Sequence, residues 1–190
     1  MIRIIIFASG SGTNAENLIK YFSNSKIATV VEVMTNNKNA GVIDRCARLK
    51  VPSTIFDAKD MVLDSFQEDL AKDADLIVLA GFLRKIPQGI IELFKDRIIN
   101  IHPALLPKYG GKGMYGMHVH QAVVDNGESE TGISIHLVNE HYDEGAILFQ
   151  AAIGVDPGDS PEDVAQKIHG LEYQPFPRII EEYINTMDHG

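Results

Sequence analysis

The sequence predicts an α/β fold with a doubly wound, mostly parallel sheet and an antiparallel addition in the C-terminal half. Short apolar runs alternate with longer amphipathic segments over the first hundred residues, the pattern of strand–helix–strand units. The first run, Ile2–Ala8, is almost continuously apolar, as expected of a strand buried on both faces. After residue 120 the alternation stops and two strands follow each other without a helix between them.

In the first half, helices connect successive strands. The predicted strands are Ile2–Ala8, Ala28–Met34, Pro52–Phe56, Asp75–Ala80 and Arg97–His102, and the predicted helices are Asn14–Phe22, Gly41–Lys50, Ala58–Lys72 and Pro87–Phe94. Pro87 suits the first turn of its helix because the missing amide would be unpaired there in any case. Pro103 ends the last strand because proline cannot donate to a ladder.

The second half begins with a long glycine-rich segment, Pro103–Met117, whose length and lack of periodicity predict a functional loop. A helix over His118–Asn126 follows, and then the strands Gly132–Val138 and Ala146–Val155 form a hairpin-like addition. The last helix, Pro161–Ile184, is expected to break near Pro175 and Pro177.

Composition limits the functional class. The chain has 190 residues, 45% of them hydrophobic, and a net charge of −9, which favours one globular domain over residues 1–190 and argues against nonspecific nucleic-acid binding. The apolar run Ile4–Ala8 is too short for a signal peptide or a membrane span. With a single cysteine, Cys46, the chain suits a reducing compartment, so we expect a cytoplasmic protein without membrane or nucleic-acid partners.

The turn Ser9–Asn14 (SGSGTN) joins the first strand to the first helix. Glycines permit close approach of the backbone to a ligand, and the free amides at a helix N-terminus attract an anion. The turn therefore predicts a phosphate cradle, although a tight connection without a ligand would have the same composition. It fits the loose dinucleotide pattern GxGxxA, but Met34–Asn37 places no acid at the end of the second strand. A single phosphate on a sugar fits better.

Asn100 and His102 close the strand before Pro103 and, two residues apart, point to the same face. An amide donor for a developing oxyanion beside a group that transfers protons is a minimal set for acyl transfer. The alternative is that both side chains only tie down the end of the strand and the following loop.

The acidic turn Asn139–Gly145 connects the two late strands. Asp143 could turn inward toward His102, where it would raise the imidazole pKa and fix the tautomer, or the turn could be solvated throughout. A metal site built on His118 and His120 is disfavoured, because residues two apart on a helix do not share a face. With no GxSxG motif and Cys46 in mid-helix, covalent catalysis is unsupported.

Four motifs together resemble the folate-dependent formyltransferases, and among them the phosphoribosylglycinamide formyltransferase family of purine synthesis. They are ASGSGTN (Ala8–Asn14), LAGFLRKIP (Leu79–Pro87), NIHPALLPKYGG (Asn100–Gly111) and DEGAILFQ (Asp143–Gln150). The chain departs from the family in Lys85, where an apolar residue is usual, and in a longer loop over Gly110–Met117. Ala58–Val62 offers only Lys59 where the family has an arginine before the third helix.

The resemblance implies a Rossmann-like formyltransferase fold with a phosphate-binding half, residues 1–100, and a catalytic, folate-binding half, residues 100–190. The co-substrate would be 10-formyltetrahydrofolate, with no metal, and a homodimer is left open. The implied catalytic residues are Asn100, His102 and Asp143. Gly12, Thr13 and Asn14 would bind the substrate phosphate, and Glu172 the ribose. The implied folate-binding residues are Leu83, Arg84, Lys85, Ile86, Asn100, Asn139, Glu140, His141, Tyr142 and Asp143.

The mechanism that follows is a hypothesis: the glycinamide amine attacks the formyl carbon, and Asn100 and protonated His102 hold the oxyanion while Asp143 keeps the imidazolium charged. Three alternatives remain. They are a deformylase that gives the formyl group to water, a non-catalytic nucleotide-binding module, and a transfer-RNA formyltransferase. The last is expected to be longer and more basic.

Overall fold

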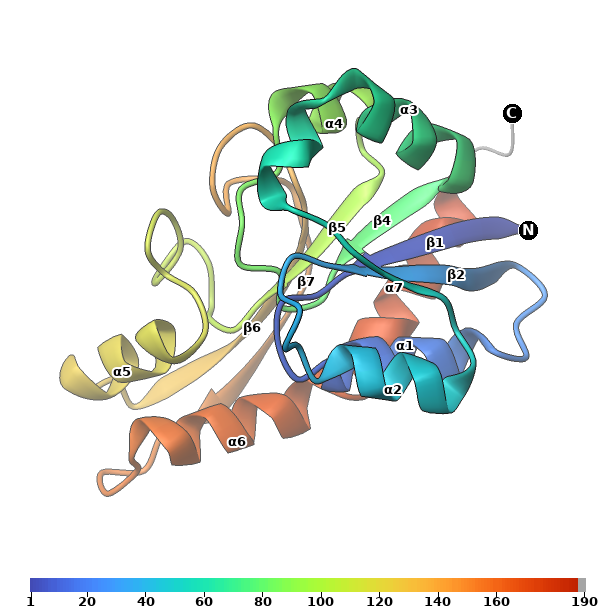
Figure 1. Cartoon of the computed structure of the whole chain (residues 1–190). Helices are drawn as coiled ribbons and strands as arrows, with labels where there is room; N and C mark the ends of the chain where they lie inside the picture. The colour runs from blue at the N-terminus through green and yellow to red at the C-terminus, as the bar shows by residue number, and fades with distance from the viewer. Residues whose placement is uncertain (188–190) are drawn as a thin grey trace.

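A computed structural model of the chain describes residues 1–187 and has a seven-stranded sheet with helices on both faces (Figure 1). The strands are β1 (Ile2–Phe7), β2 (Ala28–Thr35), β3 (Ser53–Ile55), β4 (Leu76–Leu79), β5 (Ile98–His102), β6 (Glu130–Leu137) and β7 (Ile147–Gly154). The helices are α1 (Thr13–Phe22), α2 (Val42–Leu49), the 3₁₀ helix η1 (Ala58–Val62), α3 (Asp64–Asp73), α4 (Gln88–Leu93), α5 (Met117–Asp125), α6 (Pro161–Glu172) and α7 (Pro175–Thr186).

The strand order is β3-β2-β1-β4-β5-β6-β7. The first five strands in this order pair in parallel, and β6 and β7 add to β5 as antiparallel neighbours. The predicted fold class, a mostly parallel sheet with an antiparallel C-terminal addition, is therefore confirmed.

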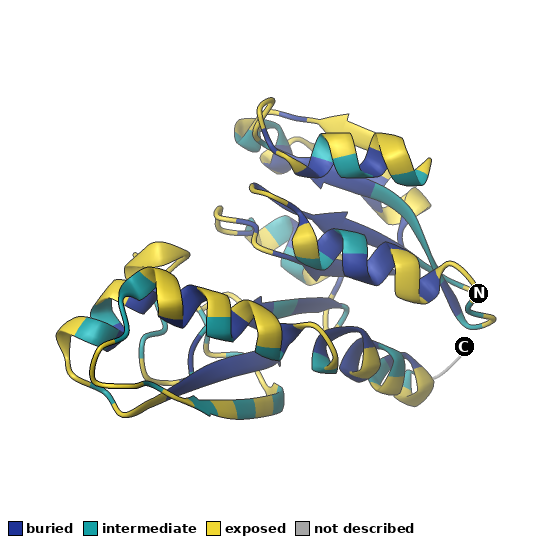
Figure 2. Cartoon of the chain, turned by 90° about the horizontal axis from the view of Figure 1, so that it is seen from below, coloured by how far each residue is buried: buried dark blue, intermediate teal, exposed yellow. Residues whose placement is uncertain are grey.

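The sheet separates two apolar layers, and successive residues of β1 point into different ones. Ile4 and Ile6 pack on the side of α1, α2, α6 and α7, whereas Ile5 and Phe7 pack on the side of η1, α3 and α4. Because β1 is buried on both faces, its sequence is apolar without alternation. Figure 2 shows the result from below: the buried residues lie along the sheet and the inner helix faces, and the exposed ones lie outside.

The segment expected as one helix, Ala58–Lys72, is two helices instead. Asp57 caps the short η1 by accepting a bond from the Lys59 amide, and Leu63 then adopts an extended backbone before α3 begins. The Gln67 side chain donates to the carbonyl of Met61 at 2.9 Å, satisfying one of the groups that the interruption leaves free. The charged composition that suggested a continuous helix carries no signal for this local capping.

The break expected in the last helix is confirmed. α6 starts with a capping box, in which Ser160 and Asp163 each bond the other's backbone amide, and ends at Glu172. α7 restarts with Pro175 in its first turn, where a missing amide costs nothing. None of the helices within residues 1–187 combines the length and apolarity that a membrane span requires.

The carboxyl ends of the parallel strands meet at one edge of the sheet. β1 and β4 are neighbours there, and the amide of Ser9 after β1 donates to the carbonyl of Gly81 after β4 at 3.0 Å. The chain leaves β1 toward β2 on one side, while β5 lies on the other side of β4. In doubly wound sheets this switch point is where ligands bind.

Candidate functional site

A cavity of about 860 Å³ opens at this edge, within the range of about 300–1,000 Å³ typical of ligand sites. It reaches from the turn after β1 to the segments after β4 and β5, and it is closed by the loop before α5 and by α6. The predicted site residues that line it are Asn14, Leu83, Arg84, Lys85, Ile86, Asn100, His102, Asn139, His141, Tyr142, Asp143 and Glu172. Gly12, Thr13 and Glu140 do not line it.

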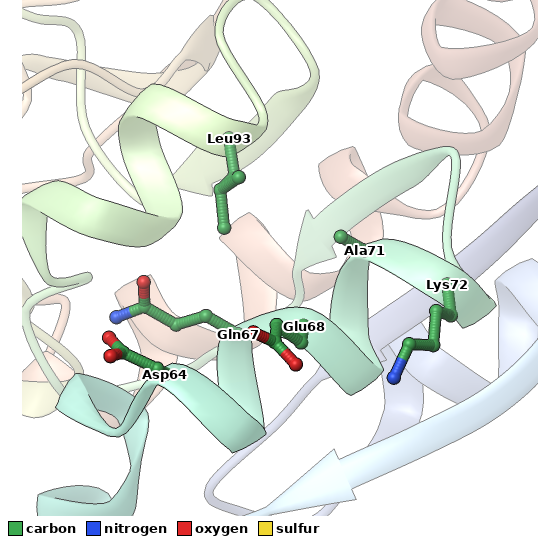
Figure 3. Close-up of a pocket in the computed structure, with 6 residues that line it drawn as sticks. All are labelled: Asp64, Gln67, Glu68, Ala71, Lys72 and Leu93. Carbon is green, nitrogen blue, oxygen red and sulfur yellow. The ribbon is translucent and has the colours of Figure 1, made fainter.

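A second hollow of about 340 Å³ lies between α3 and α4 (Figure 3). Its walls are the outward side chains of α3 with Leu93 of α4, and no residue singled out by the sequence lines it. The one amide on view, that of Gln67, already donates to Met61 at 2.9 Å. Its charged side chains, Asp64, Glu68 and Lys72, are exposed on the outside of one helix, so the larger cavity, which holds most of the predicted site residues, is the candidate site.

The structure brings His102 and Asp143 together. Of the two interpretations of the acidic turn, it therefore has the one in which Asp143 turns inward. Nδ1 of His102 lies 3.7 Å from Oδ2 of Asp143, and both side chains are largely buried. Asp143 has a left-handed backbone, with φ of 57°, and its Oδ2 accepts a bond from the amide of Gly111 at 2.9 Å. The carboxylate is therefore held from the far side by the loop before α5.

The hydrogen bonds of His102 assign its tautomer. Nε2 lies 2.7 Å from the carbonyl oxygen of Tyr109, and because a carbonyl only accepts, Nε2 carries the proton. Nδ1 then presents a lone pair on the side of Asp143. In the neutral ring this nitrogen is the one free to take a proton.

The pKa of His102 differs from the sequence expectation. Asp143 and the Tyr109 carbonyl act to raise it, as predicted for the carboxylate, but burial of the ring has the larger effect, and the pKa lies below its ordinary value. The lowered pKa favours the neutral imidazole at neutral pH in the free protein, which differs from the imidazolium expected from the sequence. The sequence could not reveal this, because it did not show that His102 is only 4% exposed.

Burial acts on Asp143 as well, and would by itself raise the pKa of the carboxyl. The neighbouring groups outweigh burial, and the Asp143 pKa lies below its ordinary value. With His102 in the tautomer assigned above, the Gly111 amide is the group that donates to the carboxylate. Asp143 is thus a carboxylate at neutral pH, ready to pair with a charge on His102.

His136 fixes the orientation of Asn100. The two residues are opposite each other in the β5–β6 register. Nδ1 of His136 lies 2.8 Å from the Leu137 carbonyl and so carries the proton, which leaves Nε2 to accept from Nδ2 of Asn100 at 3.1 Å. The alternative partner, Oδ1 of Asp143, is 3.6 Å away, beyond hydrogen-bond length. The second amide hydrogen of Asn100 therefore remains for a ligand.

The turn after β1 is built for close approach of the backbone. Gly12 has φ of 76°, and a Cβ there would meet Cγ2 of Val42 at 2.4 Å. No side chain caps α1 at this glycine, so its first amides remain available. Asn36, just after β2, supports the turn by accepting a hydrogen bond from the hydroxyl of Ser9 at 2.6 Å. A dinucleotide site would instead place an acidic residue at the end of this strand to bind the ribose.

Asn14 and Glu172 join the turn to α6 across the cavity. Nδ2 of Asn14 donates to Oε2 of Glu172 at 2.8 Å, and Glu172 is only 5% exposed. Nδ1 of His169 lies 3.2 Å from the same oxygen, and this contact raises the pKa of His169. A buried carboxylate next to free helix amides suits a ligand that carries both hydroxyls and a phosphate.

Comparison with known proteins identifies the group. A family model described as formyl transferase matches residues 2–180. The chain belongs to the formyl transferase family. Over 99% of its length it is 36% identical to the chloroplastic phosphoribosylglycinamide formyltransferase of Arabidopsis thaliana, of which it covers 68%. It is 33% identical over 95% of its length to the phosphoribosylglycinamide formyltransferase of Haemophilus influenzae, of which it covers 86%.

Structural comparison agrees. The crystal structure of glycinamide ribonucleotide transformylase 1 from Symbiobacterium toebii matches with a TM-score of 0.88 and 30% identity, covering 97% of this chain and 88% of that one. The resemblance predicted from the four motifs is therefore confirmed.

In this formyl transferase, the two segments expected to hold a folate face each other across the cavity. Nζ of Lys85 lies 5.2 Å from the centre of the Tyr142 ring, a cation–π distance. This contact gives a structural reason for Lys85, the residue noted above as a departure from the family pattern. The Leu83 amide is already occupied, since it donates to the hydroxyl of Ser9 at 3.1 Å.

The predicted loop Pro103–Met117 belongs to the site. Its backbone supplies the Tyr109 carbonyl to His102 and the Gly111 amide to Asp143, and Lys112 and Tyr115 line the cavity. The predicted functional loop thus positions the side chains of His102 and Asp143. Within residues 1–187, no group of three or more His, Cys, Asp or Glu side chains is arranged to hold a metal ion.

Proposed function

We propose that the chain transfers the formyl group of 10-formyltetrahydrofolate to the amine of 5-phosphoribosylglycinamide, a step of purine synthesis. One observation carries the proposal: an amide donor, a neutral imidazole and a carboxylate converge in a cavity that also reaches a helix N-terminus and a buried acid. The names of the relatives in the formyl transferase family support the same reaction.

The acceptor occupies the side of the cavity next to α1 and α6. Its phosphate lies against the amides of Gly12, Thr13 and Asn14, and the ribose hydroxyls donate to Glu172. In a chain of net charge −9, the phosphate depends on these local donors and on the positive end of the helix.

The formyl donor occupies the side next to Leu83–Ile86 and Asn139–Asp143. Arg84, Lys85 and Lys112 line this side and are exposed, so they complement the carboxylates of the folate tail. Asn139, His141 and Tyr142 surround the pteridine. Glu140 is exposed outside the cavity, and its contribution would come through the backbone of its turn.

His102 moves the proton that the reaction releases. When the amine attacks the formyl carbon, its nitrogen becomes positively charged, and the free Nδ1 of His102 accepts one of its protons. The imidazolium then donates from Nε2 to Tyr109 and faces the Asp143 carboxylate from Nδ1, so its charge is balanced in place. Nδ1 next gives the proton to N10 of the folate, and the bond from N10 to the formyl carbon breaks.

Asn100 stabilises the oxyanion of the tetrahedral intermediate. One of its amide hydrogens is bound by His136, so the other is directed without a reorganisation step. A donor of this kind contributes about 10²–10³ in rate, and a group that transfers protons about 10²–10⁴.

Incubating the protein with 10-formyltetrahydrofolate, with and without phosphoribosylglycinamide, tests the proposal. Transfer requires that tetrahydrofolate form only when the amine is present. Formate released in its absence would instead assign a deformylase, and no folate product under either condition would overturn formyl transfer.

We expect Thr13→Val combined with Asn14→Ala to raise KM for phosphoribosylglycinamide about tenfold or more, with little change in kcat, because the Thr13 hydroxyl and the second hydrogen of the Asn14 side-chain amide are lost as further donors to the phosphate. Asn24→Ala is the matched control, since this exposed asparagine lies just beyond the other end of α1. Steady-state kinetics at varied acceptor concentration give both constants. If only kcat fell, the phosphate would not lie at this turn.

The single cysteine, Cys46, is buried and free. This state supports placing the enzyme in a reducing compartment such as the cytoplasm.

A further inference from the structure

One buried histidine in the cavity has no task in the proposed reaction. His120 of α5 is only 4% exposed, and it lines the cavity. Its Nδ1 is shut off from solvent without a hydrogen-bond partner, and within residues 1–187 the ring makes no side-chain hydrogen bond. Buried polar atoms are normally paired, so a buried ring that lines a ligand cavity and has no side-chain partner is a candidate to bind a ligand.

The burial of His120 defines what it can offer. Burial lowers the pKa of the ring, so the imidazole is neutral, with one N–H and one lone pair. An N–H buried without an acceptor is rarer in proteins than an unsatisfied acceptor. We therefore assign the lone pair to the enclosed Nδ1 and the proton to Nε2, the ring nitrogen left to face the cavity. His120 is then a neutral hydrogen-bond donor.

His120 shares the cavity with both ends of the proposed acceptor site. His169 and Glu172 on the proposed ribose side and His102 on the proposed reacting side line the same cavity as His120. In phosphoribosylglycinamide, the group between the ribose and the reacting amine is an amide carbonyl. A carbonyl oxygen is an acceptor, and it matches a neutral N–H donor.

We propose that Nε2–H of His120 binds the carbonyl oxygen of the glycinamide unit and thereby holds the amine in line with the formyl carbon. This inference rests on the proposed function and extends it with a residue that recognises the acyl part of the acceptor. His120 thus selects an aminoacyl amide over a bare phosphosugar. A fixed carbonyl also limits rotation of the amine, which lies one carbon away.

Two ligands, three substitutions of His120 and one control substitution test the proposal. Ribose 5-phosphate lacks the glycinamide unit, whereas phosphoribosylglycinamide contains it. We expect His120→Phe to raise Kd for phosphoribosylglycinamide about 10- to 100-fold and to leave Kd for ribose 5-phosphate unchanged, as measured by calorimetry. His118→Phe is the matched control, because His118 is exposed on the same helix and does not line the cavity.

Rescue by a conservative residue identifies the atom. The amide of His120→Gln reaches the position of Nε2, so this variant should recover part of the lost affinity. The shorter amide of His120→Asn reaches only the position of Nδ1 and should not. If His120→Phe fails to fold, the comparison of His120→Gln with His120→Asn still tests the proposal.

The outcomes separate the two proposals. Equal weakening of both ligands by His120→Phe, no weakening of either, or equal rescue by Gln and Asn would overturn the role of His120 while formyl transfer by the wild-type protein stood. A wild-type protein that forms no formylated product would overturn the proposed function, and the role of His120 with it.

Discussion

Asp143→Asn is expected to lower kcat by about 10²- to 10⁴-fold, the range for a disabled proton-transfer group. The substitution keeps the size of the side chain and removes the charge that balances the imidazolium of His102, 3.7 Å away. It also places an amide where the Gly111 amide now donates to Oδ2. KM for phosphoribosylglycinamide should change little, because the proposed phosphate and ribose contacts lie elsewhere in the cavity.

The same substitution should shift a titration in a defined direction. Asp143 acts to raise the pKa of His102, although burial keeps that pKa below its ordinary value. Removing the carboxylate therefore lowers the His102 pKa further. Because the neutral ring accepts the proton, activity is lost as pH falls through this pKa, and the acid limb should move to lower pH in the variant.

Proton NMR of the His102 ring and the pH dependence of kcat measure the shift directly. Glu144→Gln is the matched control, since it removes the same charge from the adjacent, exposed residue outside the cavity. It should leave kcat within about twofold of wild type. An acid limb that moves to higher pH, or an unchanged kcat in Asp143→Asn, would remove the carboxylate from the proposed mechanism.

The sequence predicted most of the fold because its sheet is built from strongly apolar strands. β1 and β4 lie between other strands and are covered on both faces, so they appear as short continuous apolar runs. The interruption at Leu63 was not predicted, because the capping by Asp57 and Gln67 depends on contacts that composition does not encode.

The sequence predicted the site residues whose placement follows from the alternation of side chains along one strand. It did not predict those whose placement depends on how two strands pair or how a helix packs. Asn100 and His102 share a face because they are two apart in a strand. The role of His136 was not predicted, since its contact with Asn100 follows from the antiparallel pairing of β5 with β6. His120 was missed for a similar reason, because only the packing of α5 buries it.

The glycine that follows Asp143 in the DEG motif has a steric task. A Cβ on Gly145 would lie 1.8 Å from the carbonyl oxygen of Leu137, far inside van der Waals contact. The backbone at Gly145 does not have positive φ, so the constraint is space and not conformation. That Leu137 oxygen also accepts the hydrogen bond from Nδ1 of His136 at 2.8 Å. Gly145 therefore lies against the Leu137 carbonyl, which fixes the tautomer of His136. His136 in turn orients the side-chain amide of Asn100.

We expect Gly145→Ala to reduce both stability and turnover. The new methyl group must push the Leu137 carbonyl away and strain the bond from the Leu137 amide to Ala146, now 2.9 Å long. Overpacking of this kind costs about 1–3 kcal/mol of unfolding free energy, occasionally more. Because Asp143 and His136 both move, kcat should fall about 10²-fold, the loss that a displacement of about 1 Å can cause.

Urea unfolding and steady-state kinetics on the same preparations measure the two effects. Gly158→Ala is the matched control, because this glycine follows β7, has no heavy atom within 4 Å of an added Cβ and does not have positive φ. It should change stability by less than about 0.5 kcal/mol and leave kcat unaltered. If Gly145→Ala behaved like this control, the Leu137 carbonyl would not link the β6–β7 hairpin to the side-chain amide of Asn100, and the fixed tautomer of His136 would need another cause.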